Sequence, residues 1–352
     1  MRNSSILAVR RSALCALSCA ALAAALPAAS AAAPKPREAA RVPFAARYEA
    51  VQHGGVVRAA NSSTKGAKGT ESVNSGATIT YVDVDRDPNT YNSSRAELPV
   101  PAGARVSWAR LYWGGNLRVG EQKPAKDNGR VLIAEPGGAY KALLADSLIG
   151  HRTADGADAF QASADVTDLV RRSRPGQWTV AQVNVAKGRS AVGGWGGWTL
   201  VAAYEKASEP LRRIAVWDGF ETIGPRRGEL RVPVDGRRFP KGTRGRLGVI
   251  AYDGDRGTSG DYLAVDTSRS KRTRLSDSAN SANDVMNSSI TEFGTGRTVR
   301  FPDRTNTLGY DSDVFDLGGA LREGGDRVEV RFGSRKDTVW LGALFFQADV
   351  RR

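Results

Sequence analysis

The fold of this chain is decided by one stretch, Gly193-Gly194-Trp195-Gly196-Gly197-Trp198-Thr199-Leu200-Val201-Ala202-Ala203-Tyr204-Glu205. Its glycines let the backbone pass close to another surface, and its two tryptophans bring large apolar areas. The run from Trp198 to Tyr204 has the pattern of a strand that is apolar on both faces, which predicts a central strand of a sheet. A second strand is predicted directly afterwards, from Arg213 to Trp217.

The rest of the chain has the pattern of an all-β protein. Short apolar or β-branched runs alternate with Gly, Pro, Asn and Asp, and no stretch has sustained helical periodicity. The phrase Asp165-Val166-Thr167-Asp168-Leu169, followed by a glycine turn and a strand at Trp178, is frequent in jelly rolls. The Cys…Trp…Cys pattern of immunoglobulin domains is absent. We therefore predict two tandem jelly-roll-like β-sandwiches.

The second half of the chain repeats motifs of the first half in the same order. Leu111 returns as Leu247, Asp165 as Asp313 and Trp198 as Trp340, with offsets of 136, 148 and 142 residues. Similar offsets in one order predict two copies of a β unit, although unrelated β-sandwiches also share such patterns. The predicted organisation is a signal peptide over 1–31, a flexible leader with a first short strand over 32–75, one β-sandwich over 76–208 and a second over 209–352.

The N-terminus has the pattern of a secretion signal. Arg2, Arg10 and Arg11 precede an Ala-rich apolar run that is too short to span a membrane, and Ala29-Ser30-Ala31 fits a cleavage site. The pair Arg10-Arg11 leaves a twin-arginine export route open. Both cysteines, Cys15 and Cys19, lie inside this segment, so we expect a mature chain without disulfides. We expect a protein without a transmembrane segment that is secreted, either extracellular or loosely associated with the cell envelope.

The charge of the chain favours anionic partners. The formal net charge is +14, and removal of residues 1–31 would leave 48 basic and 37 acidic residues. Wall polymers and acidic glycans are the partners that such a surface suits, while an arginine-rich composition by itself also produces a basic surface. The basic residues are scattered and aromatic residues are few, which argues against specific nucleic-acid binding.

Several phrases together resemble an uncharacterised β-sandwich module of secreted and cell-surface bacterial proteins, which often precedes adhesin-like repeats. The resemblance covers most of residues 77–350 and implies no catalytic residue. It rests on residues 109–115, 165–170, 197–205 and 217–220, on Asp253-Gly254-Asp255 with Gly260-Asp261, and on residues 287–290 and 306–311.

Histidine-based chemistry is not expected. The chain has two histidines, His53 and His151, and no serine lies in a G-x-S-x-G phrase. A zinc site with Cys or His ligands is equally disfavoured. We therefore predict no catalytic residue.

Aspartates spaced by two residues are candidates for a calcium site. Such spacing places alternate carboxylates on one side of an extended loop, as hard cations require. Asp253, Asp255 and Asp261 are the best candidates, because Gly254, Gly257 and Gly260 let the backbone curl around an ion. The loops at residues 83–87 and 311–316 have similar spacing. The alternative for each loop is that the aspartates cap turns and bind their own backbone.

Trp195 is the candidate for ligand binding. Glycines flank it on both sides, so it is the tryptophan least clearly assigned to a core. It either forms an exposed platform for a flat ligand such as a sugar ring, or belongs to a bulge that leads into the Trp198 strand.

The function that fits these observations best is a non-catalytic secreted β-sandwich with an interaction or adhesion role at the cell envelope. The alternative is a carboxylate-based hydrolase, a glycosidase or amidase, that acts on extracellular glycans or glycopeptides.

Overall fold

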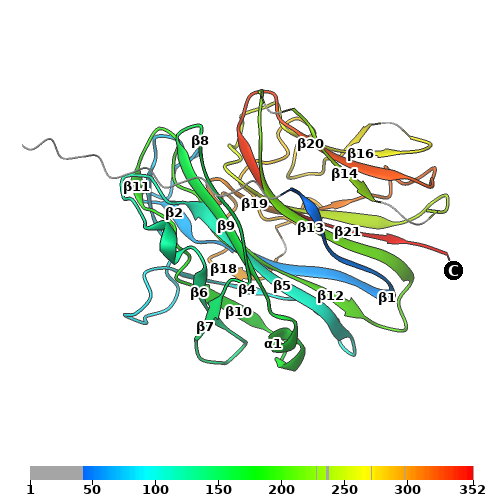
Figure 1. Ribbon diagram of the computed structural model, residues 1–352, viewed down its shortest axis with the longest axis horizontal. Helices are drawn as coiled ribbons and strands as arrows, with labels where there is room; N and C mark the ends of the chain where they lie inside the picture. Colours follow the sequence, from blue (N-terminus) through cyan, green and yellow to red (C-terminus); the bar gives the residue numbers. More distant parts are fainter. Residues whose placement is uncertain (1–42, 227, 235–237, 271, 297, 352) are drawn as a thin grey trace, which may run out of the picture. The chain divides into compact units, whose positions relative to one another are not determined.

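The computed structural model describes residues 43–226, 228–234, 238–270, 272–296 and 298–351. This part of the chain is almost entirely antiparallel β-structure, which confirms the predicted all-β fold of two tandem jelly-roll-like β-sandwiches (Figure 1). The predicted signal peptide at 1–31 and leader residues 32–42 lie outside the described residues. No helix of the described residues is long and apolar enough to cross a membrane.

The first sandwich consists of an inner and an outer sheet around one apolar core. Trp113, Trp178 and Trp198 lie in this core and are buried. The inner sheet contains the second half of β1 (Ala45–Ser62), β12 (Gly196–Glu205), β5 (Arg105–Asn116), β9 (Ala157–Asp165) and β8 (Ser147–Ala154). The outer sheet has the order β18 (Arg300–Phe301), β4 (Ser93–Glu97), β10 (Gln177–Ala181), β6 (Arg130–Ala134) and β7 (Lys141–Leu144). Smaller elements are β2 (Thr64–Gly66), β3 (Thr78–Tyr81), β11 (Gly188–Arg189), the 3-10 helix η1 (Ala125–Asp127) and helix α1 (Thr167–Arg172).

The second sandwich repeats this arrangement. Its inner sheet has the order β13 (Leu211–Ile223), β21 (Val339–Asp349), β15 (Gly245–Tyr252) and β19 (Tyr310–Asp316). Its outer sheet has the order β14 (Leu230–Val234), β20 (Val328–Gly333), β16 (Tyr262–Thr267) and β17 (Thr273–Arg274). The inner order β1-β12-β5-β9 corresponds to β13-β21-β15-β19, and the outer order β4-β10-β6 to β14-β20-β16. The strands of Trp198 and Trp340 therefore occupy equivalent positions, as the repeated motifs suggest.

Strand β1 joins the two inner sheets. Its residues 45–53 pair with β13, and its residues 54–62 pair with β12. The change of sheet falls at Gly54, whose φ is +141° and whose added Cβ would lie 1.9 Å from the carbonyl oxygen of Tyr204. A side chain would be strained and would clash there, so the bend requires glycine. The strand is 18 residues long, longer than the short strand expected in this region.

A third apolar core lies between the two inner sheets. Trp195, Tyr252 and Trp340 meet there with side chains of both sandwiches. Polar contacts cross the same layer: Tyr112 donates to Asp218 at 3.0 Å, and the amide of Gln161 donates to the carbonyl of Gly342 at 3.0 Å. The described residues thus form four main sheet layers with three cores between them, and β11, β3 and β2 form a further small sheet. The predicted division at residue 208 falls between β12 and β13, while β18 crosses it to pair with β4.

Candidate functional site

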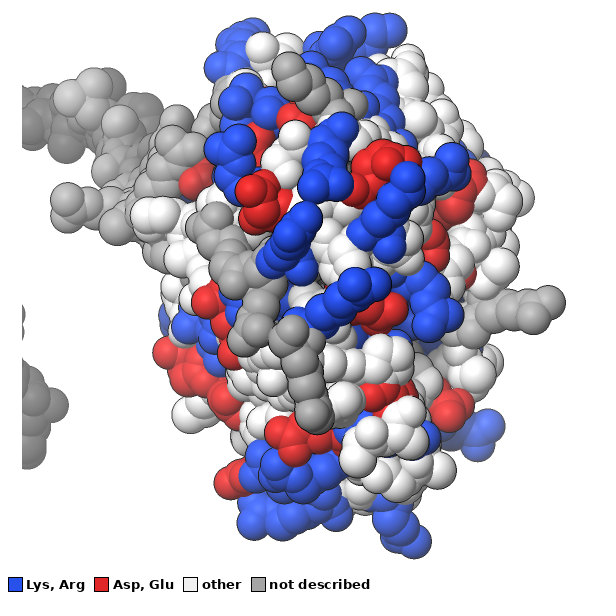
Figure 2. Space-filling view, turned by 90° about the vertical axis from the view of Figure 1, so that its right-hand side faces the viewer, with Lys and Arg blue, Asp and Glu red and all other residues white. Residues whose placement is uncertain are grey.

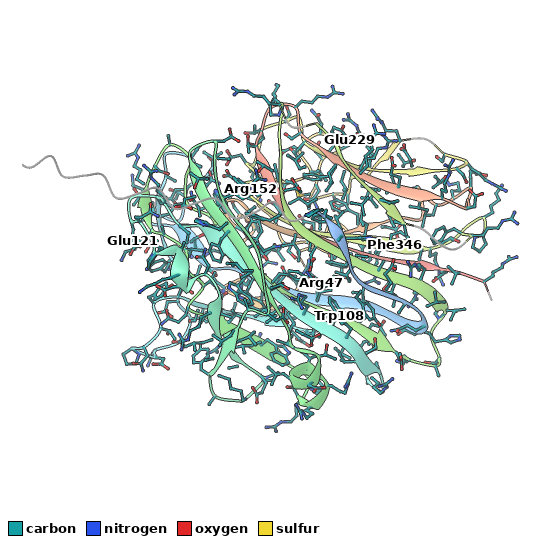
Figure 3. All side chains as sticks on the ribbon, viewed as in Figure 1. Arg47, Trp108, Glu121, Arg152, Glu229 and Phe346 are labelled. Atoms are coloured by element: carbon teal, nitrogen blue, oxygen red, sulfur yellow. The ribbon has the colours of Figure 1, made fainter. Side chains whose placement is uncertain are left out.

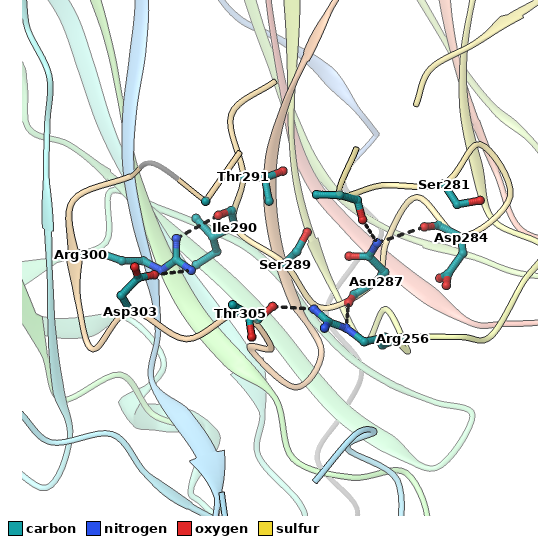
Figure 4. A pocket seen from close by; sticks show the side chains of 12 residues that line it. Arg256, Ser281, Asp284, Asn287, Ser289, Ile290, Thr291, Arg300, Asp303 and Thr305 are labelled. Carbon is teal, nitrogen blue, oxygen red and sulfur yellow. Dashed lines mark hydrogen bonds and ion pairs between the residues drawn. The ribbon is translucent and has the colours of Figure 1, made fainter. Parts of the chain in front are cut away.

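Loops at one end of the second sandwich enclose a polar hollow of about 470 Å³ (Figure 4). These loops connect β15 to β16, β17 to β18 and β18 to β19. We call this hollow the end pocket. It brings together charged and amide groups from segments far apart in the sequence: Arg256, Asp284, Asn287, Arg300, Asp303 and Thr305.

Arg256 connects two of these loops. Its Nε donates to the carbonyl oxygen of Asn287 at 3.2 Å, and its Nη2 donates to that of Thr305 (Figure 4). Both of these bonds go to backbone oxygens rather than to carboxylates. Charged donors to carbonyl oxygens form strong bonds that fix loop geometry.

Arg300 is the buried cation of the pocket. Only 6% of the residue is exposed. Its Nη1 donates to the carbonyl oxygen of Ile290 at 2.9 Å, and its Nη2 lies 2.9 Å from a carboxylate oxygen of Asp303. Desolvation lowers the pKa of the guanidinium, although Asp303 and Asp313 oppose this effect. Its Nε has no hydrogen-bond partner in the described part of the chain.

Two acceptor groups line the same pocket. The Nδ2 of Asn287 donates to the carbonyl oxygen of Ala279 at 2.8 Å, and Asp284 accepts the amide of Gly257 at 2.9 Å. The remaining oxygens, Oδ1 of Asn287 and Oδ1 of Asp284, are buried and have no partner among the described residues. Burial raises the pKa of Asp284. The residues that line the pocket therefore include both donors and acceptors without partners among the described residues.

Buried aspartates hold the wall of the pocket in place. Asp313 accepts hydrogen bonds from the backbone amide and the hydroxyl of Thr291, at 2.8 and 2.6 Å, and Asp311 accepts the amide of Ser289 at 3.0 Å. Asp261 accepts the amides of residues 285 and 286 at 2.8 and 2.6 Å. Burial raises the pKa of Asp261 to about 6 and that of Asp313 to about 7. These carboxylates stabilise the segment 285–291 from inside.

The predicted calcium ligands do not converge on one point. Asp253 accepts a bond from the amide group of Asn74 at 3.1 Å, and the backbone amide of Asp255 donates to Asp337 at 3.1 Å. No group of three or more His, Cys, Asp or Glu side chains within the described ranges could hold a metal ion as it stands. Burial raises the pKa of Asp253 well above its usual value. Calcium at Asp253, Asp255 and Asp261 thus stays a prediction.

The other two acidic segments differ from each other. Asp85 accepts the amide of Asp87 at 2.9 Å and the hydroxyl of Thr90 at 2.9 Å. Residues 311–316 are predicted as a loop from the sequence but belong to β19, and at the end of that strand Asp316 accepts the amide of Gly318 at 2.7 Å. Short local bonds of this kind are what aspartate forms in turns.

The prediction of an exposed platform at Trp195 is wrong for this structure. The side chain is fully buried in the core between the inner sheets, with ring centroids 5.8 Å from Tyr252 and 6.4 Å from Trp340. The flanking glycines serve close packing: an added Cβ on Gly197 would lie 2.6 Å from the carbonyl oxygen of Asn61. The second sandwich packs against the Trp195 ring, and residues next to Trp195 in the sequence do not reveal this contact. A ligand therefore cannot stack on this ring.

Sequence reasoning missed the end pocket. Arg256, Asn287 and Arg300 lie in no catalytic or metal-binding motif. The segments between Arg300 and the other residues of the pocket have no strand or helix periodicity that would predict their meeting. Asn287 belongs to one of the phrases that carry the family resemblance, which was the one available signal.

Fold and site together define a double β-sandwich protein with a polar end pocket. The chain belongs to the family described as "Protein of unknown function (DUF3344)", whose model matches residues 45–235. This match confirms the predicted resemblance to an uncharacterised module. None of the curated proteins matches the sequence.

Solved structures with some likeness are distant. They include the major capsid protein P2 from bacteriophage PM2, at 12% identity and TM-score 0.21, covering 76% of this chain and 96% of that chain. A structure of Sulfolobus Turreted Icosahedral Virus matches at 9% identity and TM-score 0.21, over 73% and 86% of the two chains. Peptide:N-glycanase F matches at 13% identity and TM-score 0.20, over 77% and 95%. TM-scores this low do not support transfer of function.

Proposed function

We propose that this protein is a non-catalytic binding module of the cell envelope, and that the end pocket binds a sugar unit of an envelope glycan. One observation carries the proposal: Arg300, Asn287 and Asp284 line one hollow, and each has a buried polar atom, Nε or Oδ1, without a partner among the described residues. Buried polar groups normally have partners, so such atoms in a pocket favour a polar ligand.

A sugar suits this combination of groups. Each hydroxyl of a sugar both donates and accepts, so it matches a surface that offers Arg donors and carboxylate or amide acceptors side by side. Ligand pockets of about 300–1,000 Å³ are typical for small molecules, and the end pocket, at about 470 Å³, lies in that range. The secretion signal expected from the sequence is consistent with a role at the envelope.

The pocket is rigid before any ligand arrives. Arg256 donates hydrogen bonds to the carbonyl oxygens of Asn287 and Thr305, and the carboxylate of Asp313 accepts the backbone amide of Thr291. Preorganised groups lose little conformational entropy on binding, which favours affinity from few contacts. This rigidity supports recognition of one sugar geometry.

Glycan-array binding followed by calorimetry with the best glycan tests the proposal. We expect Asp284→Asn and Asp303→Asn to weaken binding by about tenfold or more, since loss of a charged hydrogen bond costs about 1.5–3 kcal/mol. Asp168→Asn is the matched control, because this exposed aspartate lies on α1 in the first sandwich. Failure of every envelope glycan to bind, or unchanged affinity in both pocket variants, would contradict the proposal.

A hydrolase remains the second candidate function. Asp284 and Asp303 line one pocket, and burial raises the pKa of Asp284, as a general acid requires. Incubation of the protein with labelled glycans and glycopeptides distinguishes the two functions. Product release that is abolished by Asp284→Asn would favour the hydrolase, while binding without cleavage favours the module.

A further inference from the structure

The outer face of the β14-β20-β16-β17 sheet carries arginines in one row across the strands. Arg231 on β14 pairs directly with Arg331 on β20. On the other side of Arg331, Ala264 on β16 is its partner, and Ala264 in turn pairs with Arg274 on β17. Residues in register on neighbouring strands share a face, and strands lie about 4.8 Å apart. Val232, Val330 and Phe332 point the other way, into the core. Arg231 and Arg331 are therefore direct neighbours on the outer face, and Arg274 lies on the same face beyond Ala264.

A row of acids lies next to the arginine row. Glu329 on β20 pairs with Asp266 on β16. Arg331 contacts both carboxylates at 2.7 Å and also contacts Glu229 at 2.8 Å, so its charge is fully compensated. Glu229 precedes β14 and is labelled in Figure 3. Glu229 also pairs with Arg231 at 3.1 Å and with Arg272 at 3.6 Å, so it compensates part of their charge, whereas Arg274 forms no ion pair among the described residues.

More arginines flank the acid row on its far side. Arg272 and Arg327 line a hollow of about 620 Å³ together with Thr267, Ser268 and Arg331. Arg269 lies near the same loop and is exposed. Neither Arg269 nor Arg327 forms an ion pair within 4.0 Å inside the described ranges. We call the set Arg231, Arg269, Arg272, Arg274, Arg327 and Arg331 the arginine face.

Basic residues outnumber acidic residues around the arginine face. Figure 2 shows Lys and Arg side chains interspersed with Asp and Glu on the side of the molecule that it displays. The six arginines of the arginine face outnumber the acidic residues near them, which are Glu229, Asp266, Asp326 and Glu329. Arginines directly opposite each other in a sheet repel, and Glu229, which pairs with both Arg231 and Arg331, offsets part of this repulsion.

We propose that the arginine face binds an acidic polysaccharide whose sugar rings carry carboxylates. Arginine side chains of this face already form ion pairs with a carboxylate, because Arg231 and Arg331 contact Glu229 at 3.1 and 2.8 Å. An extended polymer can contact the arginine row and the hollow beside Arg327 at once. Single-stranded nucleic acid is a poorer fit, since Tyr262, the aromatic residue of this face, is buried and lies under Arg274 at 4.7 Å.

The test measures binding of the full mature chain to immobilised polygalacturonate at increasing salt. We expect binding that weakens with salt, because exposed ion pairs are screened. Arg231→Gln combined with Arg274→Gln should weaken it by about tenfold or more, since one basic side chain at an anionic surface contributes roughly 1 kcal/mol. Arg327→Gln with Arg269→Gln is a second variant that removes no ion pair of the sheet. Arg105→Gln with Arg172→Gln, exposed arginines of the first sandwich, is the control and should bind like wild type.

Three results would overturn the proposal. They are undiminished binding in both arginine-face variants, an equal loss in the control, and equally tight binding of fully methyl-esterified polygalacturonate or of single-stranded DNA. The arginine face shares no residue with the end pocket, so failure of this test leaves the proposed sugar site untouched. Unchanged binding of the best glycan to the arginine-face variants separates the two surfaces.

Discussion

At the scale of single residues, Trp195 shows that a side chain flanked by glycines in the sequence can be buried in a core. Its ring is enclosed by Tyr252 and Trp340, which come from the other sandwich. We expect Trp195→Ala to lower the free energy of unfolding by about 3–5 kcal/mol, as large aromatic truncations in cores do. Denaturant unfolding measures this loss. Val299→Ala, at a residue that is 56% exposed, is the control and should change stability by about 0.5 kcal/mol or less. A stable Trp195→Ala protein would contradict the burial.

Asp261 is expected to make stability depend on pH. Its pKa in the folded protein is about 6, raised first by burial, while an unfolded chain has the ordinary value of about 3.9. The unfolded state therefore binds fewer protons between these values, and stability falls as pH rises from about 4 to 6. The amount is roughly 3 kcal/mol at neutral pH.

Asp261→Asn removes this titration and keeps the side-chain shape. Relative to wild type, the variant should gain stability as the pH rises from 4 to 7, measured by urea unfolding at each pH. Comparison of the two proteins cancels the opposite effect of residues such as Asp146, whose pKa is lowered through its contacts with Arg110 and the amide of Asp165 in spite of desolvation. Parallel pH profiles would contradict the prediction.

At the scale of elements, the bend in β1 depends on one glycine. In Gly54→Ala the new Cβ meets the carbonyl of Tyr204 at 1.9 Å in a conformation with positive φ. We expect a loss of about 3 kcal/mol or more, since both strain and displacement of a paired strand contribute. Gly69→Ala is the matched control, because its φ is also positive, +74°, and nothing lies within 4 Å. It should lose only about 1 kcal/mol. Equal losses in the two variants would show that the clash does not matter.

The loop from Asp253 to Asp261 is the element for which calcium is predicted. Oδ1 of Asp255 and Oδ1 of Asp261 are buried without partners among the described residues, and carboxylate oxygens are the ligands that calcium prefers. We expect millimolar calcium to raise the melting temperature. A ligand at a hundredfold excess over its Kd adds about 2.7 kcal/mol. Identical melting temperatures in calcium and in chelator would contradict the predicted calcium site.

At the scale of the whole molecule, the two sandwiches are expected to unfold together. They share β1, and a core of twenty buried side chains lies between their inner sheets. Scanning calorimetry of the mature chain should show one transition with equal calorimetric and van't Hoff enthalpies. Separate fragments 43–208 and 209–352 should lack stable structure by circular dichroism, because each would expose its half of the shared core. Two resolved transitions would contradict this prediction.

The repeated strand order was predictable from the sequence, and the end pocket was not. Motif pairs such as Leu111 with Leu247 mark equivalent strands, because alternation and turns are local properties of the chain. Arg300 contacts Ile290 of the long segment that joins β17 to β18, and no spacing rule predicts the path of such a segment. The same limit applies to the raised pKa of Asp313, which arises from burial by distant segments.

The sequence by itself determined that this protein is an all-β double sandwich, because strand patterns and turn residues act over a few positions. The tertiary structure alone decided which faces are covered. Trp195 is buried because one sandwich packs on the other, and the buried Arg58 donates a hydrogen bond to the carbonyl oxygen of Thr291, 233 residues away. Burial, pocket formation and pKa shifts depend on contacts between segments that local patterns do not place, and these contacts set the chemistry of the site.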